Sequence, residues 1–567
     1  MSARPPIDPG VAAALTSQLP ARLVKKLDAE PTLAEAWAWT ATTVTTDKGE
    51  VVTLTLTDGV VRAVTCTCLL APRCLHVAAV IARLPIDDAI PLAAVAEAAP
   101  AVVSPVDEGL APVAGRAVRV LADLLAAGGE SAGAFAQAEL MRAIHSCRAA
   151  GLHRLAAAQT RVLRSVRELR DDKATFALAT LAADLREALA VAHALAAGDA
   201  TLAVIGTARR DYATIGSLKL RGVFTEAVIA RSGYAGAVTY LLGENGTLYT
   251  RSDIAPGDAA RAAGAYEAPA GLGDAVLPHR ELGRAVLFAS GATASADGRL
   301  GAGQQVQAVR AQETSTWEHP ALAARWAEPL PTQLARIAER AGVTEELRPA
   351  GWDLVFVEGT IFGAPGTVVL LVDETPVTLV TSFDDAALVA RDNLRSLARA
   401  TSLAVRVIGR VRLGQARRLE VLALAPAADE SRLPMLAAWQ GRVNLHYDRL
   451  TLPSLGGPAA VATSAPPPDV LDALQRRIER VVLGGVQTLP THAIVDLDRE
   501  AAMLADRALH GGAEVLRDLA AFAHDATRSA TGTRRHVDRE GFARAWLRAA
   551  LYAEAARRRF AVASWAR

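Results

Sequence analysis

The chain of 567 residues is poor in cysteine and in aromatic residues. It contains four cysteines, and 4% of its residues are aromatic. Four cysteines in so long a chain cannot form the dense disulfide framework of a small secreted domain, so the sequence excludes that class. Few aromatic side chains also leave few platforms on which the bases of a single-stranded nucleic acid would stack.

Excess charge of one sign and long apolar runs are also missing. The formal net charge is +1, so any affinity for nucleic acid must come from local patches. The abundance of alanine and arginine is typical of a GC-rich genome, which makes arginine content weak evidence for nucleic acid. No apolar run approaches the roughly 18 residues of a membrane span, and the first residues lack the regions of a signal peptide. We therefore expect a cytoplasmic protein in a reducing compartment.

Three of the four cysteines gather within nine positions, and a histidine follows: the cluster is Cys66, Cys68, Cys74 and His76. Three thiolates and one imidazole complete the ligand set of a structural Zn²⁺ ion and leave no open position for a substrate. The cluster therefore predicts one zinc ion and favours a binding module over a metalloenzyme. Reduced core cysteines beside an incidental histidine are the alternative. Four ligands at this spacing, with one other cysteine in the chain, favour zinc.

The residues around the cluster predict a hairpin followed by a helix. Residues 52–57 and 60–68 have strand character, and Asp58-Gly59 between them is typical of a two-residue turn. Alternation then places Cys66 and Cys68 on one face of the second strand. Residues 77–84 predict a helix. Cys74 must lie in the turn or at the first helical residue, because positions two apart in mid-helix point about 200° apart.

This arrangement resembles the SWIM zinc finger, whose pattern is CxCxₙCxH. All four ligand positions match, and the resemblance covers about residues 20 to 86. Proline commonly follows the first two cysteines of that family, whereas Thr67 and Leu69 stand here. The resemblance implies binding to DNA or to proteins. The whole chain is also similar to actinobacterial SWIM proteins found beside MoxR-type AAA ATPases and von Willebrand A-domain proteins, which implies a partner of that kind.

Composition and periodicity along the chain predict an α+β multidomain protein. It would hold a small ββα zinc finger and two Ala-rich helical bundles that flank a β-rich centre with at least one OB-like barrel. The predicted parts are the zinc finger with its lead-in (1–86), a linker (87–108), a helical bundle (109–200), a β-rich domain (201–330), a barrel with a preceding helix (331–427), an extended segment and linker (428–468) and a C-terminal bundle (469–567).

The two helical segments resemble each other in sequence. Gly128-Gly129 corresponds to Gly484-Gly485, and Phe176 and Leu181 correspond to Phe542 and Leu547 at the same spacing. The correspondence predicts a duplication, although alanine-rich helices align easily with one another. Each bundle would then provide a helical surface for interaction.

Residues 350–427 predict three strands, a helix and two strands, which is the order of an OB-fold barrel. In residues 403–413 the odd positions are apolar or glycine and the even positions include three arginines, so alternation predicts an exposed basic face. Basic grooves of this fold bind single strands. The candidate nucleic-acid contacts are Arg73, Arg406, Arg410, Arg412, Arg417 and Arg418. A solvated outer face is the alternative for any one of them. Residues 201–330 are expected to hold a second barrel.

Motifs of common catalytic sites are missing: there is no P-loop, no GxSxG, no HExxH and no GxGxxG after a strand. His279 and His446 lie beside charged residues and are expected to be structural. We therefore expect that the chain is not an enzyme. An enzyme whose active site is spread over loops stays an alternative that no motif supports, and two hypotheses lead for the function of the chain. It is a zinc-finger module that binds DNA or RNA, or it is a protein adaptor that works with an ATPase or a von Willebrand A-domain partner.

Overall fold

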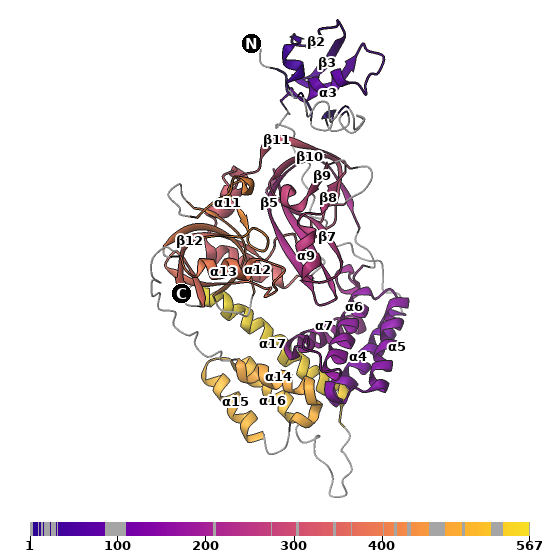
Figure 1. The fold of residues 1–567 in the computed structure, drawn as a ribbon. Coiled ribbons are helices and arrows are strands. Elements are labelled where there is room, and N and C mark those ends of the chain that lie inside the picture. Colours follow the sequence, from indigo (N-terminus) through magenta and orange to yellow (C-terminus); the bar gives the residue numbers. More distant parts are fainter. Residues whose placement is uncertain are drawn as a thin grey trace.

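The computed structural model describes residues 4–8, 11–12, 15, 23, 30, 32–85, 109–207, 211–273, 275–301, 306–343, 347–364, 366–400, 402–412, 417–427, 433–452, 471–489, 494–522 and 537–565. These residues form several packed parts of helix and sheet (Figure 1), which confirms the mixed α+β multidomain class. The predicted linker at 87–108 and residues 453–468 of the second linker lie outside the described residues.

The N-terminal part is a four-stranded antiparallel sheet with a helix packed on it. Its strands follow chain order: β1 (Ala38–Trp39), β2 (Thr43–Thr45), β3 (Val51–Thr57) and β4 (Val60–Cys66). A 3₁₀ turn, η1 (Leu33–Ala36), precedes them, and helix α3 (Leu75–Ile81) follows. Asp58 and Gly59 both have positive φ, 51° and 80°, as a type I′ hairpin turn requires. The predicted hairpin and helix are confirmed, and the sheet has two further strands.

The helices of residues 109–207 and 471–565 repeat one order. Each set has a first helix, a 3₁₀ turn and three more helices, and a short α8 (Leu202–Ile205) follows the first set. The first set is α4 (Leu110–Ala127), η2 (Gly129–Ser131), α5 (Ala134–Ala149), α6 (His153–Arg170) and α7 (Leu178–Ala196). The second set is α14 (Asp472–Gly484), η5 (Gly485–Thr488), α15 (Ile494–Asp506), α16 (His510–Ala521) and α17 (Arg539–Trp565).

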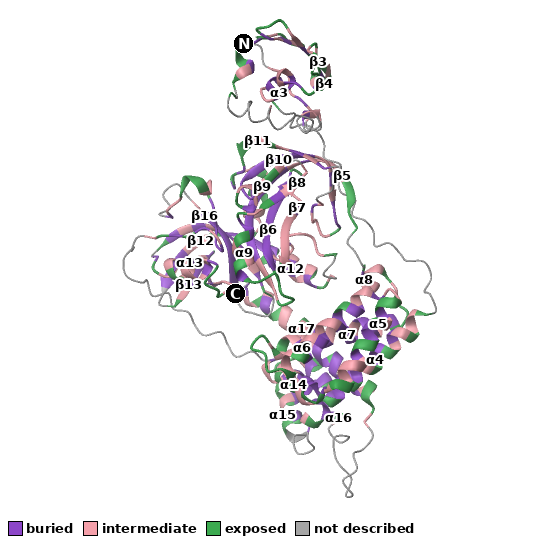
Figure 2. Cartoon of the chain, turned by 45° about the vertical axis from the view of Figure 1, so that its right-hand side comes forward, coloured by how far each residue is buried: buried purple, intermediate pink, exposed green. Residues whose placement is uncertain are grey.

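The two helical sets share a single hydrophobic core, so they form one bundle where the sequence suggested two. Leu121 and Leu189 of the first set belong to the same buried cluster as Ile478 and Trp546 of the second. Figure 2 shows buried segments of α4, α7 and α14 within this group of helices. The apolar stripe of a helix predicts that this face is buried, but it does not predict which helix packs against it. Each stripe is covered here by the other set.

The glycine pairs that end α4 and α14 explain how the two sets fit together. A Cβ atom at Gly128 would lie 2.5 Å from the carbonyl carbon of Gly484, and one at Gly485 would overlap the carbonyl oxygen of Ala126. Both glycines have positive φ, 83° and 70°. Backbone therefore packs on backbone at this crossing, which only residues without a side chain permit.

The first β unit is a five-stranded antiparallel sheet in the order β11-β10-β5-β6-β7. Its strands are β5 (Ala213–Ala230), β6 (Tyr234–Gly243), β7 (Leu248–Pro256), β10 (Ala285–Ala294) and β11 (Gln307–Thr314). Helix α9 (Ala259–Ala265), a hairpin of β8 (Pro269–Leu272) and β9 (Ala275–Pro278), and the short α10 (His279–Leu282) lie between β7 and β10 in the chain.

The second β unit has the corresponding strand order, β14-β13-β12-β15-β16, and a parallel pairing of β14 with β16 closes it into a ring. Its strands are β12 (Leu354–Ala364), β13 (Thr367–Val372), β14 (Thr375–Val380), β15 (Leu403–Val411) and β16 (Arg418–Pro426). Helix α13 (Ala390–Leu397) lies between β14 and β15 in the chain, as predicted. Helices α11 (Pro320–Ala327) and α12 (Leu330–Ala341) precede the ring.

Residues 433–452 connect the two β units, and residues 442–446 of this segment are buried, although the sequence suggested an extended segment. Strand β17 (Val443–Asn444) pairs with β16, and η4 (Ala437–Trp439) precedes it. The Arg442 guanidinium donates to the carbonyl oxygens of Ser315 and Gly283, and Arg284 makes an ion pair with Asp448 at 2.7 Å. The side chains of this segment therefore satisfy polar groups of the first unit while its backbone extends the second.

Candidate metal centre

The four predicted ligands come from the end of a strand, the following loop and the start of a helix. Cys66 is the last residue of β4, Cys68 follows in the loop, and His76 lies in the first turn of α3. Cys74 is the N-cap of that helix, where its Sγ accepts a hydrogen bond of 3.4 Å from the amide of Val77. The predicted placement of Cys74 and His76 at the helix start is confirmed.

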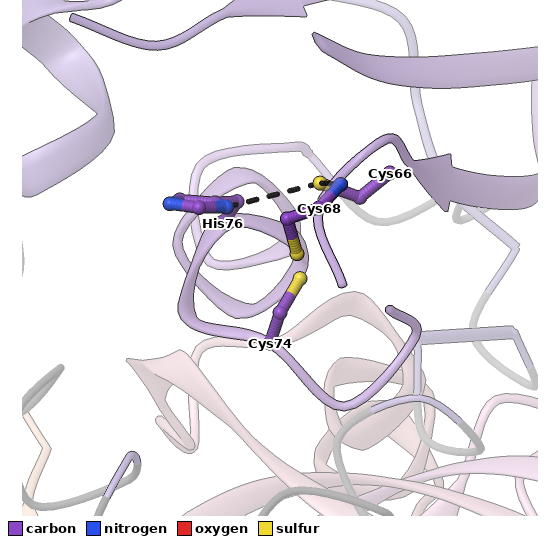
Figure 3. Close-up of side chains that lie close together, drawn as sticks. All are labelled: Cys66, Cys68, Cys74 and His76. Carbon is purple, nitrogen blue, oxygen red and sulfur yellow. Dashed lines mark hydrogen bonds between the residues drawn. The ribbon is translucent and has the colours of Figure 1, made fainter. Parts of the chain in front are cut away.

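The ligand atoms of the four side chains converge on one point (Figure 3). One ligand atom from each residue lies within 4.8 Å of the other three. The Cys66 Sγ and His76 Nδ1 atoms are 3.8 Å apart. Tetrahedral zinc, with bonds of about 2.3 Å to sulfur and about 2.0 Å to nitrogen, needs separations of about 3.6 to 3.8 Å between ligands. A small contraction brings all four ligands to bonding distance of one ion.

The chemistry of the donor set also fits a metal. Burial raises the pKa of the Cys74 thiol to about 12 and raises that of Cys66. Without a cation the Cys66 and Cys74 thiols would therefore remain protonated, whereas a coordinated thiol loses its proton outright. The pKa of the third thiol, Cys68, is lowered, because hydrogen bonds to its sulfur outweigh the effect of burial. The amide of Cys68 donates to Cys66 Sγ at 3.5 Å, so two backbone amides face the sulfurs and offset the negative charge of the thiolates.

An aromatic ring packs against the imidazole of the site, and the loop between the second and third cysteines is exposed. The buried ring of Trp37 packs edge-on against the His76 ring, with centroids 5.8 Å apart. In the loop between Cys68 and Cys74, Leu69 is fully exposed and Leu70 is 65% exposed. Arg73 is also exposed, and no hydrogen bond or ion pair joins it to the described residues. The candidate metal ligands Cys68 and Cys74 thus flank a short loop with two exposed apolar side chains and one cation.

The arginines predicted as nucleic-acid contacts do not form one exposed face. The even positions of β15 face the first β unit, where Ile408 is buried against Phe224. Arg410 binds both carboxylate oxygens of Glu226, at 2.7 and 2.8 Å, and also pairs with Asp353. Arg406 pairs with Glu318 and Glu358. Alternation correctly separates two faces of the strand, but the arginine face is largely an interface between units.

The remaining predicted arginines lie near the other end of that strand. Arg412 pairs with Glu420, and its side chain is 58% exposed. Arg417 donates to the carbonyl oxygen of Ser564 at the end of α17. Arg418 is exposed, and within the described part of the chain its side chain has no partner. The structure therefore leaves Arg73, Arg412 and Arg418 accessible. Arg73 lies in the loop before α3, whereas Arg412 directly follows β15 and Arg418 is the first residue of β16.

The two histidines expected to be structural are buried and hydrogen-bonded. His279 Nδ1 lies 2.7 Å from Thr239 Oγ1, and His446 Nδ1 accepts a hydrogen bond from the amide of Ala227. Burial lowers the pKa of His279 to about 4 and also lowers that of His446. Both rings are therefore neutral at pH 7 and serve the packing around β5 and β6.

Sequence reasoning missed two arginines of the first β unit, Arg251 and Arg299, which line a cavity described below. Neither belongs to a motif, and no local spacing links them. Within the described residues, no helix is apolar and long enough to cross a membrane. No family model, curated protein or solved structure matches the chain, so the metal centre rests on its own geometry.

Proposed function

We propose that the chain is a SWIM-type zinc-finger protein in which one structural Zn²⁺ ion, held by Cys66, Cys68, Cys74 and His76, shapes an interaction module. The convergence of one ligand atom from each residue to within 4.8 Å carries this proposal. A four-ligand zinc site supplies much of the folding free energy of so small a part. The metal would supply structure and no chemistry, and the proposal assigns no catalytic role to the chain.

Metal analysis of the purified full-length protein tests the zinc site. We expect one zinc ion per chain, complete loss in Cys74→Ala, and retention in the matched control Cys147→Ala. Cys147 is buried in α5 and lies outside the cluster. Circular dichroism of Cys74→Ala should show that the helical bundle stays folded, since its core contains no residue of the finger. Stoichiometric zinc in Cys74→Ala would refute the site.

The exposed loop favours a protein as the partner of the module. Leu69 and Leu70 present apolar surface that folding does not cover, and such surface becomes buried in protein interfaces. The role proposed is that of an adaptor, and the resemblance to SWIM proteins suggests a MoxR-type ATPase or a von Willebrand A-domain protein as its partner. The near-neutral net charge supports a protein partner over a polyanion.

A pull-down with the purified partner proteins tests the adaptor role. Leu69→Asp with Leu70→Asp should abolish capture, whereas Leu436→Asp, at a leucine 59% exposed in a distant segment, should not. Nuclease treatment should leave capture unchanged. Capture that survives the double substitution would refute the loop as the contact.

DNA or RNA binding is the second candidate, and it is favoured by the exposed cations Arg73, Arg412 and Arg418. An OB-like barrel, inferred from the strand order and the β14–β16 closure of the second unit, would support it. Binding through phosphates weakens steeply with salt, with a slope of about −0.7 per contact for single strands. Arg73→Gln should then make the slope of log affinity against log salt concentration shallower by about 0.7, the value of one phosphate contact. A slope equal to that of the unaltered protein would exclude Arg73 as a phosphate contact.

A further inference from the structure

A cavity of about 490 Å³ opens beside β7 in the first β unit. Its walls are Tyr212, Arg251, Ser252, Ile254, Thr293, Arg299, Leu300 and Gly301. The volume is within the range of about 300 to 1,000 Å³ typical of sites for small ligands. Two guanidinium groups and three hydroxyl groups therefore share a space large enough for a small molecule.

The two guanidinium groups of this cavity have no carboxylate partner among the described residues. Arg251 Nη1 donates to the Leu300 carbonyl oxygen at 3.4 Å, and its buried Nε has no acceptor. Arg299 Nε donates to Ser252 Oγ at 2.9 Å. The carboxylate of Asp253, next in the strand, is paired with Arg261 at 2.7 Å. Burial and the neighbouring charge of Arg299 lower the pKa of Arg251, and they outweigh the opposing effects of Tyr212 and Asp253.

A second cavity, of about 470 Å³ and partly lined by both β units, provides the contrast. It also contains arginines, but Arg410 and Arg412 are neutralised there by Glu226, Asp353 and Glu420. Its third arginine, Arg348, donates to the carbonyl oxygens of Val343 and Ala341. Among the described residues, the cations Arg410 and Arg412 of the second cavity are paired with carboxylates, whereas Arg251 and Arg299 beside β7 are not.

We propose that the cavity lined by Arg251 and Arg299 binds the phosphoryl group of a small phosphorylated ligand. Two guanidinium forks match the oxygens of a phosphoryl group, and charge-assisted hydrogen bonds of this kind are about twice as strong as neutral ones. The hydroxyls of Ser252 and Thr293 add donors for the remaining oxygens. The Tyr212 ring, 42% exposed, stands in the same wall and offers a face for the rest of the ligand.

Gly301 keeps this space open. A Cβ atom built there would overlap Thr293 Oγ1 and would lie 3.2 Å from Tyr212 Cδ1. Gly301→Ala therefore narrows the cavity while it leaves both charges in place. This substitution tests the cavity without removing either guanidinium group.

Calorimetric titration of the zinc-loaded full-length protein with inorganic pyrophosphate tests the proposal. We expect binding at one site, weakened at least about tenfold by Arg251→Gln, by Arg299→Gln and by Gly301→Ala. Arg280→Gln should leave it unchanged, because Arg280 is an exposed arginine of the same unit that is paired with Glu267. Acetate at equal ionic strength should bind at least about tenfold more weakly than pyrophosphate, since it fills one fork.

Several results would overturn the assignment. These are no binding of pyrophosphate at millimolar concentration, equal weakening by Arg280→Gln, or equal affinity for acetate. If binding of a single-stranded oligonucleotide required Arg251 while binding of pyrophosphate did not, the cavity would be a nucleic-acid site and the small-ligand proposal would be rejected. Melting curves of each variant establish that it is folded. No candidate zinc ligand lines the cavity, so we expect Cys74→Ala to bind pyrophosphate as the unaltered protein does, which keeps this test separate from that of the metal centre.

Discussion

The two β units have the same strand order, but only the second is closed within the described residues. In the second unit β14 pairs with β16 through Thr378, Leu379 and Val380, and the sheet becomes a ring. In the first unit β7 is an outer strand that meets the segment after β10 through a single bridge, Thr250 to Arg299. We call these two places the closed seam and the open seam.

The side chains at the two seams differ as strongly as the pairing does. At the closed seam Leu379 and Leu419 are buried in the core of the ring. At the open seam Arg251 and Arg299 line a cavity and lack carboxylate partners among the described residues. Apolar burial stabilises a fold, whereas a half-buried charge without an oppositely charged partner costs stability unless a ligand compensates it. One topology therefore gives a structural unit where it is closed and a candidate binding unit where it is open.

The largest expected effect is at the interface that holds the two units together. Arg410→Met leaves Glu226, 3% exposed, as an unpaired buried carboxylate, and should cost about 3 to 5 kcal/mol. Denaturant unfolding followed by hydrogen exchange in β5 and β15 measures this loss. Arg418→Met, at an exposed arginine of the ring, should stay within about 0.5 kcal/mol.

A second substitution at the interface separates loss of the ion pair from loss of packing. Glu226→Met combined with Arg410→Met replaces both charges by apolar groups and should recover most of the stability. If Arg410→Met lowered the free energy of unfolding no more than Arg418→Met does, the ion pair of Arg410 with Glu226 would not hold the two units together.

Acid should weaken the first unit through His279. Because its pKa is lowered from 6.5 to about 4 by burial, the unfolded chain binds a proton below pH 6.5 while the folded chain does not. Stability is therefore lost as the pH falls from 6.5 towards 4, at about 1.4 kcal/mol per unit and about 3 kcal/mol in all. His279→Gln should flatten this slope in β6, measured by hydrogen exchange between pH 7 and pH 5. An unchanged slope would assign the acid sensitivity to other groups.

Local sequence determined how much of this structure was predictable. Cys66, Cys68, Cys74 and His76 lie close in the chain, so hairpin and helix signals were enough to assemble them. The succession of three strands, a helix and two strands in residues 350–427 followed from patterns within each segment, but the order of the strands in the sheet comes from the fold. The partner of Arg410 did not follow, because Glu226 is 184 residues away. Alternation identifies two faces of a strand, but only tertiary packing decides which of them meets solvent.

Two further features had no local signal. The apolar stripes of the helical segments predicted bundles, but the contact of Gly128 with Gly484 that merges them joins distant residues. The anionic ligand proposed for the open seam depends on Arg251 and Arg299, which are brought together by the Thr250–Arg299 bridge. Whether these two arginines have carboxylate partners depends on tertiary structure, so the sequence alone does not predict it.

The smallest expected effect is a difference in amide exchange between the seams. At the closed seam the amide of Thr378 donates to the Arg417 carbonyl oxygen at 2.8 Å. At the open seam the amide of Thr250 donates to Gly298, and alternation points those of Ser252 and Ile254 to the same outer edge. We expect Ser252 and Ile254 to exchange at least about tenfold faster than Thr378, because local opening of an edge costs less than opening of a ring.

Exchange in the presence of pyrophosphate sharpens the same comparison. A ligand that binds the folded state between Arg251 and Arg299 stabilises that state by mass action and should slow exchange at Ser252. Thr378, in the closed unit, should not change. Equal rates at Ser252 and Thr378 without ligand would contradict the comparison, because they would mean that a further strand covers β7. Slowing at both positions would show that the units respond as one body and that the cavity is coupled to the ring.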